Sequence, residues 1–179
     1  MIRLFIVFIL LLNLFETSSN RRDKKRICWN QNQVLSWKDF TGKVSKFGNY
    51  DAVPKLLIEY KVISSSSIIV ENCMVKNQSW VRKESQTPEL LIHEQYHFNL
   101  SEVIARKIRR EMSNIHTIDA IALQEIYTKW IEISKDEQAQ YDKETSHNKI
   151  NSEQIKWQIK IDNELDSLKE YQNEIIYLN

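Results

Sequence analysis

His93, Glu94 and His97 form an H-E-x-x-H pattern inside residues 90–106. An α-helix advances about 100° per residue, so on a helix His97 lies one turn beyond His93 and about 40° around, where both imidazoles can bind one metal ion. Glu94 can then reach a water on that ion. The pattern is typical of zinc metallopeptidases. The simpler interpretation, two exposed histidines on an ordinary helix, leaves unexplained why two of only four histidines have this spacing.

A catalytic zinc ion needs three protein ligands and an open position for water. Glu102 is close in the sequence, but nine residues after His93 it lies about 180° around the same helix. We therefore expect it to contact Arg106 or to lie in the outer shell of the metal site. We predict His147 as the third ligand, because the polar segment 142–149 connects two expected helices that can fold back beside the first. The alternative third ligands are Glu144 in the first place, and then Asp142 and Glu137.

Such a site would hydrolyse a peptide or protein substrate. Zinc lowers the pKa of its bound water toward about 7, so Glu94 can take the proton as general base while the zinc polarises a carbonyl. Glu94 would then return the proton to the leaving amine. An oxyanion donor is also expected, and Tyr141 is our candidate, with Tyr96 as the alternative.

The composition limits the partners of this chain. Its 25 basic and 24 acidic residues give a formal net charge of +1, which provides no long-range field for attracting nucleic acid. A length of 179 residues suits one domain with its own core. We therefore expect a monomer that does not bind nucleic acid.

The N-terminus has the order of residues found in signal peptides. A basic residue precedes an apolar run at residues 4–12, and small polar residues follow it, which favours cleavage near Asn20. The run is shorter than the roughly 20 residues of a membrane span, although an uncleaved anchor is the alternative. We expect residues 1–19 to be a signal peptide and residues 20–179 to form one secreted or periplasmic domain, without stable membrane insertion.

Cys28 and Cys73 are the only cysteines. Export would place them in an oxidising compartment, which favours a disulfide between them. This bond would stabilise the fold by about 3 to 4 kcal/mol. Two separately buried thiols are the alternative, and the absence of a C-x-x-C spacing makes the cysteines poor zinc ligands.

Hydrophobic periodicity predicts the elements that must position the motif. Two alternating apolar runs predict an antiparallel pair of strands. Thr87 as N-cap and a proline at the first helical position predict the start of the motif helix. The fold class is therefore α+β, with a small N-terminal antiparallel sheet followed by three helices. The predicted strands are residues 56–63 and 68–75, and the helices are residues 88–112, 118–141 and 151 onward.

The motif helix also carries a basic cluster near its C-terminal end. We expect this cluster to be mostly exposed to solvent, because a run of charges is more often a solvated face than a binding patch. Its members are Arg106, Lys107, Arg109 and Arg110.

Several motifs together resemble a bacterial family of unknown function whose members are described as secreted zinc-dependent proteases. The resemblance implies a compact zincin-like α+β domain, a His-Glu-His core and export. It also supports His147, because the late motif of that family has a His followed by Gly; here Asn148 replaces that Gly, and Asn tolerates the left-handed backbone conformation better than most residues. The similar segments are residues 37–42, 79–81, 93–98 with Glu102, Ala105 and Arg106, and 141–157.

A second function class is compatible with the same residues. An exported binding or envelope-associated protein could keep a zinc site for stability and cleave nothing. Glu94 favours the enzyme, because zinc binding alone does not require a carboxylate beside the water.

Overall fold

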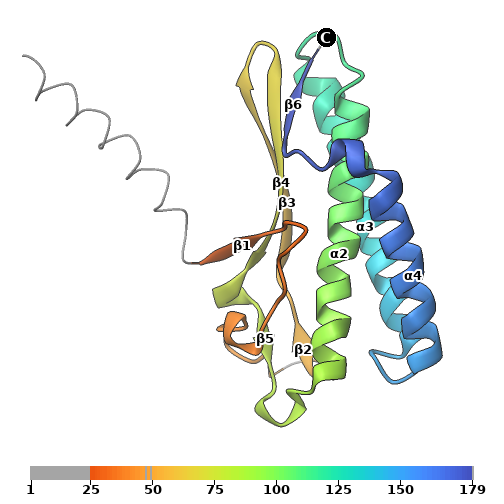
Figure 1. Cartoon of the computed structure of the whole chain (residues 1–179). Coiled ribbons are helices and arrows are strands. Elements are labelled where there is room, and N and C mark those ends of the chain that lie inside the picture. Colours follow the sequence, from red (N-terminus) through yellow and green to blue (C-terminus); the bar gives the residue numbers. More distant parts are fainter. Residues whose placement is uncertain (1–24, 47, 49, 179) are drawn as a thin grey trace, which may run out of the picture.

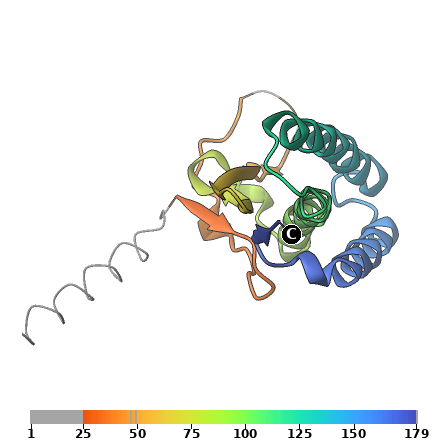
Figure 2. The same ribbon diagram turned by 90° about the horizontal axis from the view of Figure 1, so that it is seen from above.

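The computed structural model describes residues 25–46, 48 and 50–178, so the predicted signal peptide lies outside the described residues. Helix α2 (Pro88–Met112) is the central element. Figures 1 and 2 show the sheet on one side of α2 and the helices α3 (Ala120–Thr145) and α4 (Asn151–Ser167) on the other. This arrangement confirms the predicted α+β class, with a small antiparallel sheet followed by three helices.

The main sheet is built around strand β4 (Ser67–Val75). Strand β3 (Leu56–Ser64) pairs along one edge of β4, and this antiparallel pair confirms the two strands predicted from alternation. Strands β1 (Arg26–Cys28) and β6 (Ile175–Tyr177) pair with the two ends of the other edge. Strand β6 was not predicted, because three residues are too few to give a periodic pattern.

A second, two-stranded sheet lies near the start of α2. Its strands are β2 (Ala52–Val53) and β5 (Trp80–Val81), and they are antiparallel. Strand β5 pairs with β2 and is not part of the main sheet. The described residues also form four short 3-10 helices: η1 (Trp37–Asp39), η2 (Lys76–Gln78), η3 (Lys83–Ser85) and η4 (Lys169–Tyr171).

Helix α2 begins and ends where the sequence predicts. The Thr87 side chain accepts a hydrogen bond from the backbone N–H of Leu90 at 3.2 Å, which satisfies one of the free donors of the first turn. Pro88 is the first helical residue, where its missing N–H costs nothing. The helix ends at Met112, as expected.

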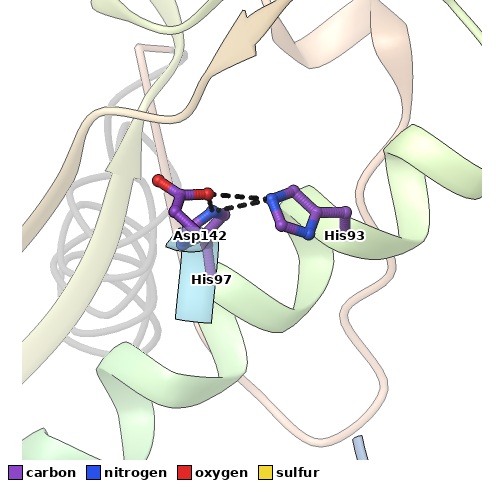
Figure 3. Close-up of side chains that lie close together, drawn as sticks. All are labelled: His93, His97 and Asp142. Carbon is purple, nitrogen blue, oxygen red and sulfur yellow. Dashed lines mark hydrogen bonds and ion pairs between the residues drawn. The ribbon is translucent and has the colours of Figure 1, made fainter. Parts of the chain in front are cut away.

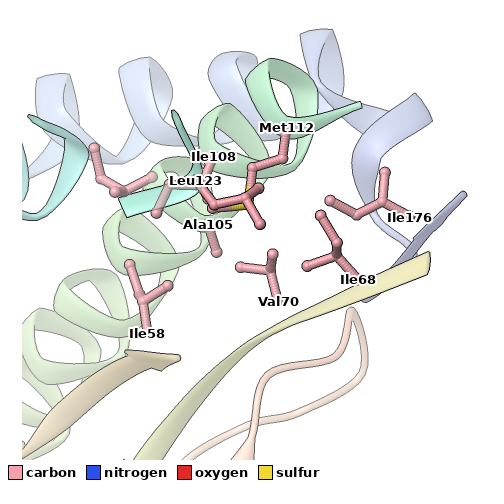
Figure 4. Packing of buried hydrophobic residues seen from close by; sticks show 9 residues of the cluster. Ile58, Ile68, Val70, Ala105, Ile108, Met112, Leu123 and Ile176 are labelled. Atoms are coloured by element: carbon pink, nitrogen blue, oxygen red, sulfur yellow. The ribbon is translucent and has the colours of Figure 1, made fainter. Parts of the chain in front are cut away.

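Apolar residues of α2 pack between the sheet and the other helices. Ile104, Ile108 and Met112 are fully buried against residues of β4 and α3, as Figure 4 shows for this cluster. Burying such side chains stabilises a fold by about 1.5 to 3 kcal/mol each. The motif helix is therefore fixed on both sides. The cluster consists of Ile58, Ile68, Val70, Ile104, Ala105, Ile108, Met112, Leu123 and Ile176.

The prediction that the basic cluster is mostly exposed is wrong for two of its four members. Arg106 and Arg109 are 4% and 1% exposed. Glu102 accepts hydrogen bonds from both guanidinium groups, at 3.1 Å and 2.7 Å, and Arg109 also donates to the backbone carbonyl of Val70 in β4. Burial is tolerated because each charge has a partner. The expected contact between Glu102 and Arg106 is confirmed.

Cys28 and Cys73 form the predicted disulfide, which joins β1 to β4. Their strands pair in register at these two residues, so the bond is a direct consequence of the sheet. Within residues 25–46, 48 and 50–178, no helix has the length and apolar character needed to span a membrane.

Candidate metal centre

Three side chains from two helices converge beside the sheet. His93 and His97 project from α2, and Asp142 projects from α3, as Figure 3 shows. The two histidine Nε2 atoms are 3.1 Å apart, and Asp142 Oδ1 lies 3.1 Å and 3.0 Å from them. The three ligand atoms thus form a nearly equilateral triangle.

Two glutamine amides fix the orientation of the imidazole rings. His93 Nδ1 is 2.9 Å from Gln154 Oε1, and His97 Nδ1 is 2.5 Å from Gln138 Oε1. An amide oxygen can only accept a hydrogen bond, so both Nδ1 atoms carry the proton. In the neutral rings the free lone pair is therefore on Nε2, facing Asp142. Metal-binding histidines have this arrangement, with the second nitrogen donating to a fixed acceptor.

The triangle fits a small metal ion. Tetrahedral zinc with bonds of about 2.0 to 2.1 Å places its ligand atoms about 3.3 Å apart, close to the observed separations of 3.0 to 3.1 Å. The histidines are buried and Asp142 is partly exposed, and these three side chains form the metal-compatible group among the described residues. His93, His97 and Asp142 could therefore hold a metal ion.

The three groups are electrostatically coupled. Burial alone would raise the pKa of Asp142, but its contacts with the two imidazoles of His93 and His97 outweigh burial and hold this pKa well below its usual range. Burial lowers the pKa of His93. For His97 burial acts in the same direction, but the hydrogen bond to Asp142 and the charge of Glu94 together raise its pKa.

Glu94 lies next to this group and is 3% exposed. One of its carboxylate oxygens, Oε2, is buried and has no hydrogen-bond partner among the described residues. Burial raises the pKa of Glu94 to about 7. An unpartnered buried carboxylate is costly, so such a group indicates a functional role more often than a structural one.

A cleft of about 700 Å³ gives access to the centre. Its floor is the face of α2 that carries His93, Glu94 and His97. One wall is the segment 50–58, which includes β2 and the start of β3, and the other is α3 together with the turn that follows it. The cleft is large enough for several residues of a peptide.

His147, predicted as the third ligand, lies at one end of the cleft. Its Nδ1 is 3.0 Å from the same Asp142 oxygen that faces the two buried imidazoles. Its ring also makes an edge contact with Tyr50 across the cleft, with centroids 5.4 Å apart. The structure therefore brings His147 to the centre through Asp142.

An unusual backbone turn holds His147 in this place. Ser146, His147 and Asn148 have φ values of 50°, 51° and 69°, so three consecutive residues other than glycine are left-handed. This conformation costs roughly 1 to 2 kcal/mol for each such residue, although Asn tolerates it better. The left-handed conformation expected at Asn148 is confirmed. Strain of this kind is concentrated at functional sites.

The other alternative ligands lie elsewhere. Glu144 is exposed and accepts hydrogen bonds from Trp157 and Gln140, away from the imidazoles. Glu137 faces Lys107 of α2, with a nitrogen to oxygen distance of 3.9 Å. Neither is part of the converging group.

The two tyrosines considered as oxyanion donors have other contacts. The Tyr141 hydroxyl is fully buried, donates to the backbone carbonyl of His93 at 3.3 Å and accepts from Gln154. The Tyr96 hydroxyl donates to Asp162 on α4 at 2.9 Å. Neither tyrosine lines the cleft, so this geometry gives the predicted role no support. Instead, the Tyr141 ring stacks on His93.

Asp142 ranks low among the predicted ligands because the second helix was expected to end near residue 141. Helix α3 continues to Thr145, so Asp142 lies on a helical face and not in a loop. The useful signal is the spacing of Gln138, Tyr141, Asp142 and Thr145, which at steps of three and four residues share one face toward α2. Gln138 and Gln154 were missed because amides have no motif of their own.

Comparison of the chain with protein-family models, with curated proteins and with solved structures gave no match.

Proposed function

We propose that this protein is an exported zinc-dependent metallopeptidase. The observation that carries the proposal is the buried Glu94, whose unpartnered Oε2 lies beside the convergent Nε2 atoms of His93 and His97. A site that bound metal only for stability would have no need to keep an unpaired carboxylate in its interior. Glu94 also lines the cleft, where it can contact a substrate.

The residues divide into distinct roles. His93, His97 and Asp142 would hold zinc, which when bound supplies a polarised water and a Lewis acid for the substrate carbonyl. Glu94 would accept the proton of the attacking water and return it to the leaving amine. Gln138 and Gln154 keep the imidazole rings in orientation.

The wall formed by β3 supports a peptide as the substrate. Lys55 accepts a hydrogen bond from Val75 in β4 at 2.8 Å, so by antiparallel alternation the backbone groups of Leu56 and Ile58 point to the opposite edge. That edge faces the cleft, where the carbonyl of Ile58 accepts from Tyr127 on α3. The N–H groups of Leu56 and Ile58 and the Leu56 carbonyl can pair with an extended peptide.

The disulfide supports export as part of the proposal. A bond between Cys28 and Cys73 is compatible with an oxidising compartment and unusual in the reducing cytosol. The destination, periplasm or medium, follows from fractionation of cells that express the full chain.

The first test measures zinc content and hydrolysis together. Protein purified from residue 20 onward should bind one zinc ion and cleave denatured protein substrates. Glu94→Gln should keep the zinc but lose at least about a thousandfold in kcat/KM, because it removes the general base and no ligand. A wild-type protein that binds one zinc ion and cleaves none of a broad peptide library would contradict the peptidase proposal and favour the non-catalytic zinc protein.

The second test identifies the third ligand. Asp142→Asn should weaken zinc binding by more than about a hundredfold, whereas His147→Ala should weaken it by about tenfold, the range of an outer contact. His116→Ala, in an exposed position, is the matched control. Dissociation constants come from competition with a chromophoric chelator. The reverse order of the first two variants would assign the ligand role to His147.

A further inference from the structure

The cleft extends well beyond the metal centre along α3. Residues of this helix line it at steps of three and four: Tyr127, Ile131, Lys135, Gln138 and Asp142. Three of these residues already use their polar side-chain groups in hydrogen bonds. Tyr127 donates to the carbonyl of Ile58, Gln138 donates to the carbonyl of His97, and Asp142 contacts the imidazoles. Lys135 is different, because its ammonium group forms no ion pair in the described part of the chain.

The nearest residues on α3 do not neutralise Lys135. The residues four positions away are Ile131 and Ala139, which carry no charge. Three acidic residues lie near Lys135 on α3, and none forms an ion pair with its ammonium group among the described residues: Glu132, Asp136 and Glu137. Two other lysines of the helices do have a partner: Lys107 pairs with Glu164, and Lys129 with Glu111.

Outside the metal centre, the cleft lining has one carboxylate, Asp51, and three lysines. Of its three carboxylates, Glu94 and Asp142 belong to the metal centre, and Asp51 accepts a hydrogen bond from Ser85 at 2.8 Å. Two further lysines, Lys55 and Lys149, line the cleft. Away from the metal centre, the cleft therefore has a positive charge that a substrate can neutralise.

The position of Lys135 defines a distance along the substrate. Lys135 lies seven residues before Asp142. On a helix this spacing places the two residues about 20° apart around the axis and about 10 Å apart along it. An extended peptide rises about 3.3 Å per residue. A substrate that follows α3 from the metal centre therefore reaches Lys135 about three residues from the bond that is cleaved.

We propose that Lys135 is a specificity residue that binds an aspartate or glutamate side chain of the substrate about three residues from the scissile bond. The proposal rests on the proposed peptidase function and adds the substrate class, peptides with an acidic residue at that distance. Lys135 lines the cleft but is exposed, so the ion pair would be partly screened by water and should raise kcat/KM by about two- to fivefold.

The test uses fluorogenic decapeptides in which one glutamate is moved through all positions of an otherwise neutral sequence. The matched peptide has glutamine at the same position. With the zinc-loaded protein, the ratio of kcat/KM for the glutamate and glutamine peptides should peak at one position about three residues from the cleaved bond. Lys135→Glu should reverse this ratio and favour a lysine at that position.

Lys61→Glu is the control, because it makes the same charge change at an exposed residue of β3 outside the cleft. A ratio that stays within twofold at all positions, or that changes equally in Lys135→Glu and Lys61→Glu, would overturn the proposal.

A binding measurement separates this proposal from the peptidase function. The same labelled peptides are titrated against zinc-loaded Glu94→Gln by fluorescence anisotropy. Tighter binding of the glutamate peptide, lost in Glu94→Gln combined with Lys135→Glu and weakened by salt, supports the role of Lys135 even where no peptide is cleaved. Equal binding of all peptides to both proteins would contradict it.

Discussion

At the scale of single residues, the properties of the centre depend on which side-chain atoms have a hydrogen-bond partner. The Nδ1 atoms of His93 and His97 are committed to amide oxygens, which leaves Nε2 of both rings directed to one point. Glu94 is the opposite case, because its Oε2 is buried without a partner among the described residues. His93 and His97 are thus oriented to bind a cation, whereas Oε2 of the Glu94 carboxylate lacks a hydrogen-bond partner in the described part of the chain.

The raised pKa of Glu94 predicts how the stability of the metal-free protein depends on pH. A carboxyl group whose pKa is about 7 in the folded state and about 4.5 in the unfolded state stabilises the fold below pH 4.5. This contribution is lost as the pH rises through 7. In the presence of a chelator, the free energy of unfolding of the wild type should therefore fall relative to Glu94→Gln between pH 5 and pH 8.

The difference between the two proteins should reach up to about 3 kcal/mol. It is measured by urea unfolding at each pH. The other titrating groups are present in both proteins, and among them His97 has a pKa that depends on the charge of Glu94. A difference that is the same at pH 5 and pH 8 would show that Glu94 does not titrate abnormally.

At the scale of elements, the centre needs α2 and α3 at a fixed distance. Helix α2 is tied to the sheet and to η4 by the buried group of Glu102, Arg106 and Arg109. Asn72 of β4 extends this group by donating to Glu102 at 3.4 Å. The network lies on the face of α2 opposite the imidazoles, so it positions the motif without contacting the cleft.

Removing Glu102 should destabilise the fold strongly. Glu102→Ala would leave two buried guanidinium groups without their carboxylate, and breaking a buried pair in this way costs about 3 to 5 kcal/mol. Glu125→Ala, at an exposed position of α3, is the control and should change stability by less than about 0.5 kcal/mol. Urea unfolding provides both values. A loss below about 1 kcal/mol in Glu102→Ala would show that water or a rearranged partner replaces the carboxylate.

At the scale of the whole molecule, β1 is short and pairs with β4 through three residue pairs, and the disulfide joins the same two strands. The sheet in turn forms the surface on which α2 packs. Loss of the disulfide should therefore affect the stability of the whole domain, while the metal centre, formed by α2 and α3, stays intact in the folded protein.

The double variant Cys28→Ala/Cys73→Ala should lower the free energy of unfolding by up to about 4 kcal/mol, the value for closing a loop of this length. Its zinc content at a temperature where it remains folded should equal that of the wild type. Thermal unfolding and metal analysis check these two expectations. Loss of zinc from the folded double variant would mean that the sheet and the metal centre are more tightly coupled than the contacts indicate.

The sequence by itself determined the features that depend on residues close together in the chain. The spacing of His93 and His97 depends only on helical geometry, and the start of α2 depends on Thr87 and Pro88, so both were predictable from neighbouring residues. The strands β3 and β4 follow from alternation in the same way. The two cysteines could be paired because there was no third one.

The tertiary structure decided what depends on contacts between distant segments. Asp142 faces the imidazoles because α3 continues beyond its predicted end and packs against α2, and the pattern of one helix does not reveal this. The glutamines that orient the rings, the burial of Arg106 and Arg109 and the position of Lys135 in the cleft have the same origin. A helix period fixes which residues share a face, but only packing fixes what that face meets.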